Sequence, residues 1–387
     1  MSERNLSLIL LNIQPKKTTM KTILSLIFSS LFLFFAEAKD PVTLSVGSEA
    51  PDFNLKGVDG KMHTLESFRK APILVIIFTC NHCPTAQAYE DRIIAFQEKY
   101  KEQGVQVVAI SPNADKAVRF DELGYTDLSD SYEEMVIRAK DKKYNFPYLY
   151  DGESQTTATA YGPTTTPHAF VFNKKRILKY VGRIDDEEHI GRATKFDLEN
   201  AVKELLEKDE VSVPETKTFG CSIKWMDKAD WKLKEVESWK SEEVKLEDLN
   251  IEGLKKLMTE KSEKYRLINF WATWCGPCVT EFSALTETDK MYRNRDFEFI
   301  SISIDDAKSR NKVTEFLKKK YASNKNYLYG NLHKYELIEA VDKKWPGALP
   351  YTILLSPDGK IVYRQSGMIE ARDLRKAIVE HIGRYYP

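Results

Sequence analysis

Residues 266–282 read RLINFWATWCGPCVTEF, so an apolar run leads directly into two cysteines, Cys275 and Cys278. The pattern predicts a buried strand followed at once by a helix. The first thiol then lies at the helix N-terminus, where unpaired backbone N–H groups and the helix dipole favour a thiolate. The second cysteine, three residues on, lies on the same helical face. The pair can therefore close a disulfide, and the stretch predicts a redox-active Cys-x-x-Cys site.

A structural zinc site is the alternative for this pair. Zinc takes about four protein ligands, commonly from two Cys-x-x-Cys pairs. No second pair stands near Cys275 in the sequence. We therefore favour redox chemistry and expect no metal at this site.

The motif WCGPC and its surroundings resemble the active site of the thioredoxin superfamily. An apolar strand precedes the motif, an amphipathic pattern follows it, and Leu349 and Pro350 stand before a later β run, 352–355. In that family a cis-proline at this later position packs against the disulfide. The resemblance therefore implies that Pro350 is cis, that Leu349 faces the sulfurs, and that Trp274 contacts the substrate.

The second half of the chain resembles the TlpA/ResA-like disulfide reductases more closely than plain thioredoxin. It shares with them the sequence motif WATWCGPC and an expected helix, 333–344, inserted before the cis-proline. Asn269 stands where thioredoxin has a buried aspartate. The TlpA-like pattern offers an acid three residues after the second cysteine, and Glu281 occupies that position. The resemblance implies that Glu281 moves the proton of Cys278, with an ordinary surface glutamate as the alternative.

The first half of the chain repeats this organisation. A continuously apolar run, 73–79, is typical of a strand covered on both faces, and it ends at the motif CNHC, from Cys80 to Cys83. Two short strands joined by an Asp-Gly turn precede it within residues 50–65. In the first half we further expect strands at 105–111, 148–150, 166–172 and 177–181 and helices at 132–142 and 195–207. In the second half we expect strands at 266–271, 297–304, 352–355 and 361–365 and helices at 313–321, 333–344 and 371–382.

This order of elements resembles the redoxin branch of the superfamily, the peroxiredoxin-like and TlpA-like proteins. The resemblance implies that Pro167 is a second cis-proline, that Thr166 faces the sulfurs, and that Cys80 and Cys83 form a second redox-active disulfide. Peroxiredoxins carry their reactive cysteine in a P-x-x-x-T-x-x-C pattern, and neither cysteine of this pair has a threonine three residues before it. Dithiol–disulfide exchange is therefore a better interpretation of this site than peroxidase activity.

His82 distinguishes the first cysteine pair from the second. Close to the helix N-terminus and to Cys80, its ring can stabilise the Cys80 thiolate and make the disulfide more oxidising. Proteins with histidine at this position have potentials of about −120 mV, against about −270 mV for CGPC thioredoxin, so electrons would run from the second site to the first if these values transferred. A surface His82 without a redox role is one alternative. Copper binding by Cys80, Cys83 and either His82 or His168 is another.

The N-terminal 38 residues have the outline of a signal peptide. Met20 opens a basic start, and a short apolar run, 23–35, closes on the sequence Ala-Glu-Ala. We expect translation to start at Met20 and cleavage to follow Ala38, which would leave a periplasmic or secreted protein without a membrane span. An uncleaved membrane anchor is the alternative.

The remaining stretch of roughly 350 residues is long enough for two domains with separate cores. We expect an α/β protein with two tandem thioredoxin-like folds, at 43–210 and 246–387, each a central mixed β-sheet flanked by helices. Residues 211–245 read as a charged linker with isolated tryptophans, and they contain Cys221. Cys221 is the odd cysteine of five, so it is either buried and inert or a resolving or relay thiol.

These observations lead to an expected function, that of an extracytoplasmic thiol–disulfide oxidoreductase. Cys275 attacks a protein disulfide and Cys278 resolves the mixed disulfide, and Cys80 and Cys83 do the same in the first domain. The dithiol is the reagent, so no cofactor is expected. Partners are protein thiols and disulfides, with a membrane protein as candidate electron donor. Because 58 basic residues balance 58 acidic ones and are interspersed with them, no nucleic-acid surface is expected.

Three other functions stay open at this stage. A peroxiredoxin-like thiol peroxidase would use Cys80 or Cys83 as the reactive thiol and Cys221 to resolve it. A copper-binding chaperone would use the first domain. A binding module would keep one of the two cysteine pairs as a vestige.

Overall fold

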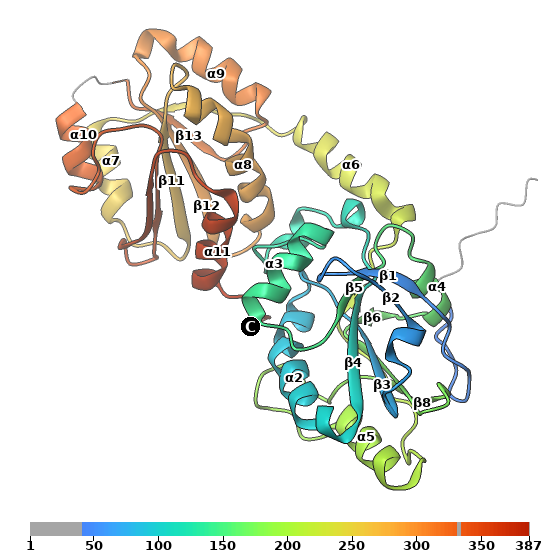
Figure 1. Cartoon of the computed structure of the whole chain (residues 1–387). Coiled ribbons are helices and arrows are strands. Elements are labelled where there is room, and N and C mark those ends of the chain that lie inside the picture. The colour runs from blue at the N-terminus through green and yellow to red at the C-terminus, as the bar shows by residue number, and fades with distance from the viewer. Residues whose placement is uncertain (1–40, 331–333, 387) are drawn as a thin grey trace, which may run out of the picture. The chain divides into compact units, whose positions relative to one another are not determined.

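The computed structural model describes residues 41–330 and 334–386. The expected signal peptide and the rest of the N-terminal extension lie outside the described residues, as does His333 at the start of one expected helix. Two β-sheets dominate the described part, each with helices on both of its faces (Figure 1). Within these ranges we find no helix with both the length and the apolar character needed to cross a membrane.

The first sheet has seven strands. They are β1 (Asn54–Gly57), β2 (Met62–Thr64), β3 (Ile73–Phe78), β4 (Val105–Ser111), β5 (Tyr148–Tyr150), β7 (His168–Phe172) and β8 (Leu178–Gly182). Their order is β2-β1-β5-β4-β3-β7-β8, with β3, β4 and β5 parallel and with β1, β2, β7 and β8 in antiparallel pairs. The helices of this half are α2 (Pro84–Tyr100), α3 (Tyr132–Lys142), α4 (Thr156–Tyr161) and α5 (Asp197–Lys208).

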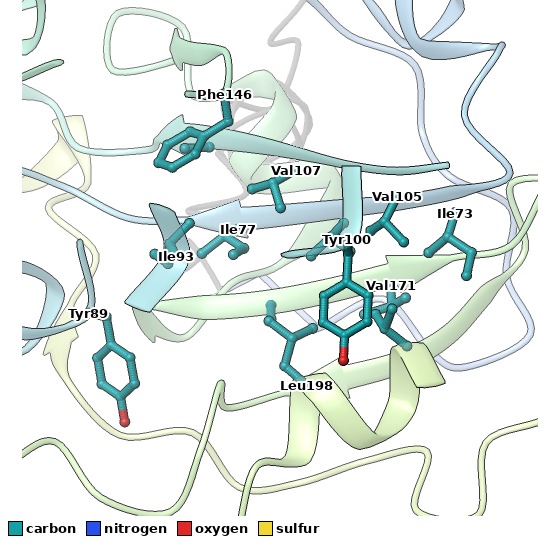
Figure 2. Packing of buried hydrophobic residues seen from close by; sticks show 14 of the residues in the cluster. Ile73, Ile77, Tyr89, Ile93, Tyr100, Val105, Val107, Phe146, Val171 and Leu198 are labelled. Atoms are coloured by element: carbon teal, nitrogen blue, oxygen red, sulfur yellow. The ribbon is translucent and has the colours of Figure 1, made fainter. Parts of the chain in front are cut away.

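Strand β3 is buried along its whole length because both of its faces are covered. Ile73, Val75 and Ile77 point into one core, which helices α2, α3 and α5 close. Figure 2 shows Ile73 and Ile77 in this core together with Ile93 of α2 and Leu198 of α5. Leu74 and its alternate neighbours point into the opposite core, which α4 helps to close. The continuous apolar run therefore fixes β3 at the centre of the sheet, and the cysteine motif follows directly after it.

The second sheet has six strands. They are β10 (Glu247–Asp248), β11 (Tyr265–Trp271), β12 (Phe297–Ser303), β13 (Lys325–Leu328), β14 (Tyr351–Leu355) and β15 (Ile361–Ser366), in the order β10-β13-β12-β11-β14-β15. Strands β10 to β13 run parallel, and β14 and β15 are antiparallel. The helices of this half are α7 (Ile251–Thr259), α8 (Gly276–Tyr292), α9 (Arg310–Lys319), α10 (Lys334–Val341) and α11 (Ala371–Ile382).

Strand β11 has a hydrophobic core on each of its faces, as β3 has in the first half. Leu267 points into a core that α8 and α11 close. Ile268 and Phe270 point into the other core, closed by α7 and α10. The expected fold class is confirmed, since each half is a mixed sheet with helices on both faces.

The segment expected to be a linker contains regular structure. Strand β9 (Cys221–Ser222) pairs with β6 (Thr165–Thr166) in a separate two-stranded ladder, and Trp225 packs on the first core. Helix α6 (Ala229–Trp239), which the sequence pattern did not predict, follows, and the side chain of Trp239 is buried. The domain boundaries at 210 and 246 stay a prediction.

Candidate active sites

Cys275 and Cys278 form a disulfide at the N-terminus of α8. Cys275 is the N-cap residue, and its Sγ accepts a hydrogen bond from the backbone N–H of Cys278 at 3.3 Å. Cys275 is 7% exposed, whereas Cys278 is fully buried. A partner therefore reaches the sulfur of Cys275 first, which is the order expected for nucleophile and resolving cysteine.

An apolar groove of about 330 Å³ borders Cys275. Trp274 and Leu349 line it, and the indole of Trp274 is 62% exposed. The peptide bond between Leu349 and Pro350 is cis, as the resemblance implied. The groove also has walls that the sequence did not reveal, because they come from the residue after β12, from α10 and from the loop before β14. These lining residues are Ile304, Lys334, Leu337, Ile338, Trp345, Gly347 and Ala348.

Glu281 lies one turn along α8 from Cys278 and is buried. Its Oε1 accepts a hydrogen bond from Asn269 Nδ2 at 3.0 Å, and its Oε2 accepts one from the backbone N–H of Ile369 at 2.8 Å. Burial raises the pKa of Glu281 to about 7, against the lowering effect of these two bonds. The surface-glutamate alternative is wrong. A carboxyl group that titrates near neutral pH can both take and return a proton at this position.

The first cysteine pair differs from the expectation. The predicted Cys80–Cys83 disulfide is absent from the described structure, in which Cys83 is bonded to Cys221 and Cys80 is a free, buried thiol. The reason is the ladder between β6 and β9, which sets Cys221 opposite Thr166. The carbonyl oxygen of Thr166 lies 3.4 Å from Cys83 Sγ, so the ladder brings Cys221 to that sulfur. The expected order of reduction potentials rested on a Cys80–Cys83 disulfide, and it stays a prediction for that form of the site.

Thr166 contacts both cysteines of the CNHC motif. Its Oγ1 lies 3.2 Å from Cys80 Sγ, and its peptide bond to Pro167 is cis. The expectation that Thr166 faces the sulfurs agrees with this geometry. Cys83 is the N-cap of α2, where its Sγ accepts the backbone N–H of Ala86.

His82 is buried, so the surface alternative is wrong for this residue too. Its Nδ1 lies 2.6 Å from Asp130 Oδ2. Asp130 is held in turn by the side-chain amide of Asn113 at 2.7 Å and by the backbone N–H groups of Asn81 and His82. Sequence reasoning missed Asp130 and Asn113, because neither belongs to a motif and both are far from His82 in the chain.

The charges of His82 and Asp130 shift the pKa of each group. Burial alone would lower the pKa of His82, but the Asp130 carboxylate and then the Cys80 sulfur outweigh burial and raise it well above its ordinary value. Burial likewise favours a higher pKa for Asp130, yet His82 and the hydrogen bonds hold it below its ordinary value. The two groups therefore stand as an ion pair next to a free thiol.

Cys80, His82 and Asp130 are the described residues that come nearest to a metal-binding cluster, with possible ligand atoms within 4.8 Å of one another. The copper set considered above needs the Cys83 thiolate, which the disulfide to Cys221 withholds. His168 Nδ1 accepts the backbone N–H of Thr164, and burial lowers the pKa of His168 to about 4. The ligand set expected for copper is therefore not assembled in this form of the site.

Each half of the chain matches a known protein family. Residues 46–181 match the AhpC/TSA family, and residues 242–378 match the Redoxin family. The thiol-disulfide oxidoreductase ResA of Bacillus subtilis is 29% identical over 117 residues, which are 30% of this chain and 60% of ResA. A chloroplastic peroxiredoxin Q of Triticum aestivum is 27% identical over 163 residues, 40% of this chain and 66% of that protein.

The match to solved structures includes a hypothetical protein from Sinorhizobium meliloti. It is 33% identical, covers 48% of this chain and 97% of its own, and has a TM-score of 0.43. Fold, motifs and family matches together define a protein of the thioredoxin class. The chain belongs to the thioredoxin superfamily and carries two redoxin-type domains in tandem. It spans 60% and 66% of the length of the two curated relatives named above.

Proposed function

We propose that this chain is an extracytoplasmic thiol–disulfide oxidoreductase in which Cys275 and Cys278 exchange electrons with the disulfides of other proteins. The observation that carries the proposal is the Cys275–Cys278 disulfide itself, which sits at a helix N-terminus beside an apolar groove. A buried carboxyl group, Glu281, lies on the same helix one turn away. The groups proposed as nucleophile, resolving thiol and proton carrier thus lie within about two turns of α8.

The reduced form starts the reaction. The thiolate of Cys275, favoured by the α8 N-terminus, attacks one sulfur of the target disulfide, and the other target sulfur leaves as a thiolate. Cys278 then attacks the mixed disulfide, which closes Cys275–Cys278 and releases the second target sulfur. The thiol proton of Cys278 passes to Glu281, whose pKa of about 7 suits it to accept a proton near neutral pH. Two electrons have moved from the chain to the target.

The groove beside Cys275 favours a protein substrate. It is lined mainly by aliphatic and aromatic side chains, with Lys334 as its charged residue, and Trp274 presents a largely exposed ring. Such a surface suits an apolar segment on either side of a target cysteine, since buried aromatic contacts dominate recognition of this kind. Leu349, which precedes the cis-proline Pro350, lines the groove together with Cys275.

Export is part of the proposal. The pattern at residues 20–38 supports a signal peptide, and two disulfides in one chain are typical of proteins in oxidising compartments. An oxidoreductase that reduces targets there needs a source of electrons, so a membrane protein that delivers them is the partner class we propose.

The test is insulin reduction by the full chain with dithiothreitol as electron source. We expect Cys275→Ser to abolish the activity and Cys278→Ser to reduce it strongly. Cys80→Ser serves as the matched control, because it removes a cysteine of the other site, and it should retain most of the activity. Full activity in Cys275→Ser would overturn the proposal.

A thiol peroxidase at the first site is a second candidate. It is favoured by the free thiol of Cys80 next to the ion pair of His82 and Asp130. Peroxide would oxidise this thiol to a sulfenic acid, and condensation with the Cys83 thiol would release water and form a disulfide. Consumption of hydrogen peroxide by the reduced full chain, lost in Cys80→Ser and kept in Cys275→Ser, would establish this activity.

A further inference from the structure

Strand β9 lies on the edge of the first site as a docked peptide would. Ser222 pairs with Thr165 and Cys221 pairs with Thr166 in an antiparallel ladder. Thr166 is also the residue that contacts Cys80 and Cys83. The segment thus brings its own cysteine to the sulfurs of the CNHC motif and bonds to one of them.

Gly220 allows this close approach. Its φ is +134°, and a Cβ on this residue would lie 2.2 Å from the carbonyl oxygen of Thr166. A backbone atom cannot move aside as a flexible side chain can, so any larger residue would lift β9 from β6. The ladder therefore depends on glycine at this position.

The arrangement joins a free thiol to a neighbouring disulfide. Cys80, Cys83 and Cys221 pack together in one small cluster. Cys80 and Cys83 are 3% and 0% exposed, and Cys221 is only partly buried. Thiol–disulfide exchange needs only a thiolate with access to one sulfur of a disulfide, and the cluster contains both.

We propose that Cys80, Cys83 and Cys221 form a three-cysteine exchange site in which the Cys80 thiolate opens the Cys83–Cys221 disulfide and releases Cys221 as the thiol that reacts with a protein partner. The inference rests on the proposed function in that it assigns the first domain to the same class of reaction. It adds Cys221 as a residue that takes part in the chemistry. It also states the order in which the three cysteines react.

The step balances without any external oxidant or reductant. The bond between Cys83 and Cys221 breaks, and a bond between Cys80 and Cys83 forms. The electron pair of the broken bond leaves on the Cys221 sulfur, which takes a proton from solvent. The Cys80 thiol gives up its proton to solvent, and the positive charge that His82 already carries in its ion pair with Asp130 stabilises the thiolate that attacks. The number of thiols and of disulfides is unchanged.

The exposed fractions of the three cysteines indicate which of them a protein partner can reach. The two sulfurs of the CNHC motif are closed to a bulky partner, whereas the released Cys221 lies on a surface strand. The released Cys221 thiolate would therefore be the group that meets a protein disulfide. It would attack one target sulfur and form a mixed disulfide, while the other target sulfur leaves as a thiolate and the Cys80–Cys83 disulfide stays intact.

The test is native alkylation of the oxidised full chain followed by disulfide mapping. All samples carry Cys275→Ser and Cys278→Ser, so the second site supplies no thiol. We expect N-ethylmaleimide to label Cys221 slowly, and the labelled molecules to contain a Cys80–Cys83 disulfide. Adding Cys80→Ser should abolish labelling of Cys221. Label on Cys80 with the Cys83–Cys221 bond intact, absence of label on Cys221, or labelling of Cys221 that persists in Cys80→Ser would overturn the proposal.

A second variant tests the docked strand without removing a cysteine. Gly220→Ala should lift β9 and raise the labelling rate of Cys221 by at least about tenfold, with Cys80–Cys83 as the main disulfide. Gly191→Ala is the matched control, since Gly191 also has a positive φ, +81°, but an added Cβ would meet no atom within 4 Å. An unchanged rate in Gly220→Ala would contradict the role given to the strand. None of these measurements uses insulin reduction, so the exchange site and the Cys275–Cys278 activity stand or fail separately.

Discussion

His82 Nδ1 lies 2.6 Å from Asp130 Oδ2, and both side chains are buried beside the free thiol of Cys80. An ion pair at this depth is screened weakly, so its charge acts strongly on the neighbouring sulfur. We expect the positive charge of His82 to favour a free Cys80 sulfur over one bound in a disulfide. This charge would act together with the β6–β9 ladder, which brings Cys221 to Cys83.

The first prediction concerns the balance between the two disulfide forms. In His82→Gln the charge that favours a free Cys80 is lost, so the ratio of Cys80–Cys83 to Cys83–Cys221 should rise by roughly 5- to 30-fold, which corresponds to about 1–2 kcal/mol. Asp130→Asn should shift it in the same direction. The ratio is measured by acid quenching and mass-spectrometric disulfide mapping of the oxidised chain.

The control for this shift is another histidine–aspartate pair. His63 Nε2 lies 3.1 Å from Asp59 Oδ1 near the protein surface. His63→Gln should leave the ratio of disulfides unchanged. Equal ratios in wild type and His82→Gln would show that the buried pair does not control the site.

The second prediction concerns Glu281 as the proton carrier for Cys278. Glu281→Gln keeps the shape of the side chain and its acceptor oxygen but cannot bind and release the proton. The rate of insulin reduction at pH 7 should fall by about 100-fold, and the rate should lose its dependence on a group titrating near pH 7. Glu287→Gln, on the same helix but only partly buried, is the control. A pH profile that is the same in Glu281→Gln and wild type would contradict the role.

The third prediction follows from the same carboxyl group but concerns stability. Its pKa is about 7 in the folded protein against an ordinary value of 4.5, so below pH 4.5 both states are protonated and Glu281 costs nothing. Between pH 4.5 and 7 the unfolded state ionises first, and above pH 7 the cost to the folded state is complete, at about 3 kcal/mol. Glu281→Gln should therefore raise the free energy of unfolding by more at pH 8 than at pH 4.

Urea unfolding at these two pH values measures the difference. We expect the gain from Glu281→Gln at pH 8 to exceed the gain at pH 4 by about 2–3 kcal/mol. Equal gains at both values would mean that folding does not raise the pKa of Glu281.

The fourth prediction concerns the groove beside Cys275. Trp274→Ala removes a ring that is 62% exposed, so folding should be unaffected. The value of kcat/KM for insulin should fall by about tenfold because KM rises. Aromatic contacts of this kind contribute roughly 1–2 kcal/mol to binding. A small disulfide such as bis(2-hydroxyethyl) disulfide, which has no apolar segment to place in the groove, should react at the wild-type rate.

Trp231→Ala tests whether this loss is specific. Trp231 is 52% exposed on α6 and does not line the groove. Its replacement should leave both substrates unaffected. Equal losses for insulin and for the small disulfide in Trp274→Ala would place the effect on the sulfur chemistry and not on docking.

The parts of the fold that were predictable from the sequence are those with a local signal. The continuous apolar sequences of β3 and β11 predict these two buried strands, and each strand leads into its cysteine motif. Glu281 and the two cis-prolines were expected from the spacing of known motifs. Helix α6 and strand β13 were missed, because their short, charged sequences are polar on most positions and carry no clear period.

The first site could not be predicted in the same way, because it is assembled from distant segments. Cys83 and Cys221 are 138 residues apart, and the contact depends on a two-residue ladder that leaves no periodic pattern. Asp130 comes from the segment between β4 and α3, where nothing in the composition marks it as the partner of His82. Proximity of this kind follows from the tertiary fold and not from local spacing.

The most direct test of the central claim is to trap the mixed disulfide. Cys278→Ser leaves Cys275 without its resolving thiol, so incubation of the reduced variant with oxidised insulin should accumulate a covalent adduct that dithiothreitol releases. Peptide mapping should place insulin on Cys275, and Cys275→Ser with Cys278→Ser should form no adduct at that site. An adduct on Cys80, Cys83 or Cys221 alone, with Cys275 still free, would contradict the claim that the Cys275–Cys278 pair reduces protein disulfides.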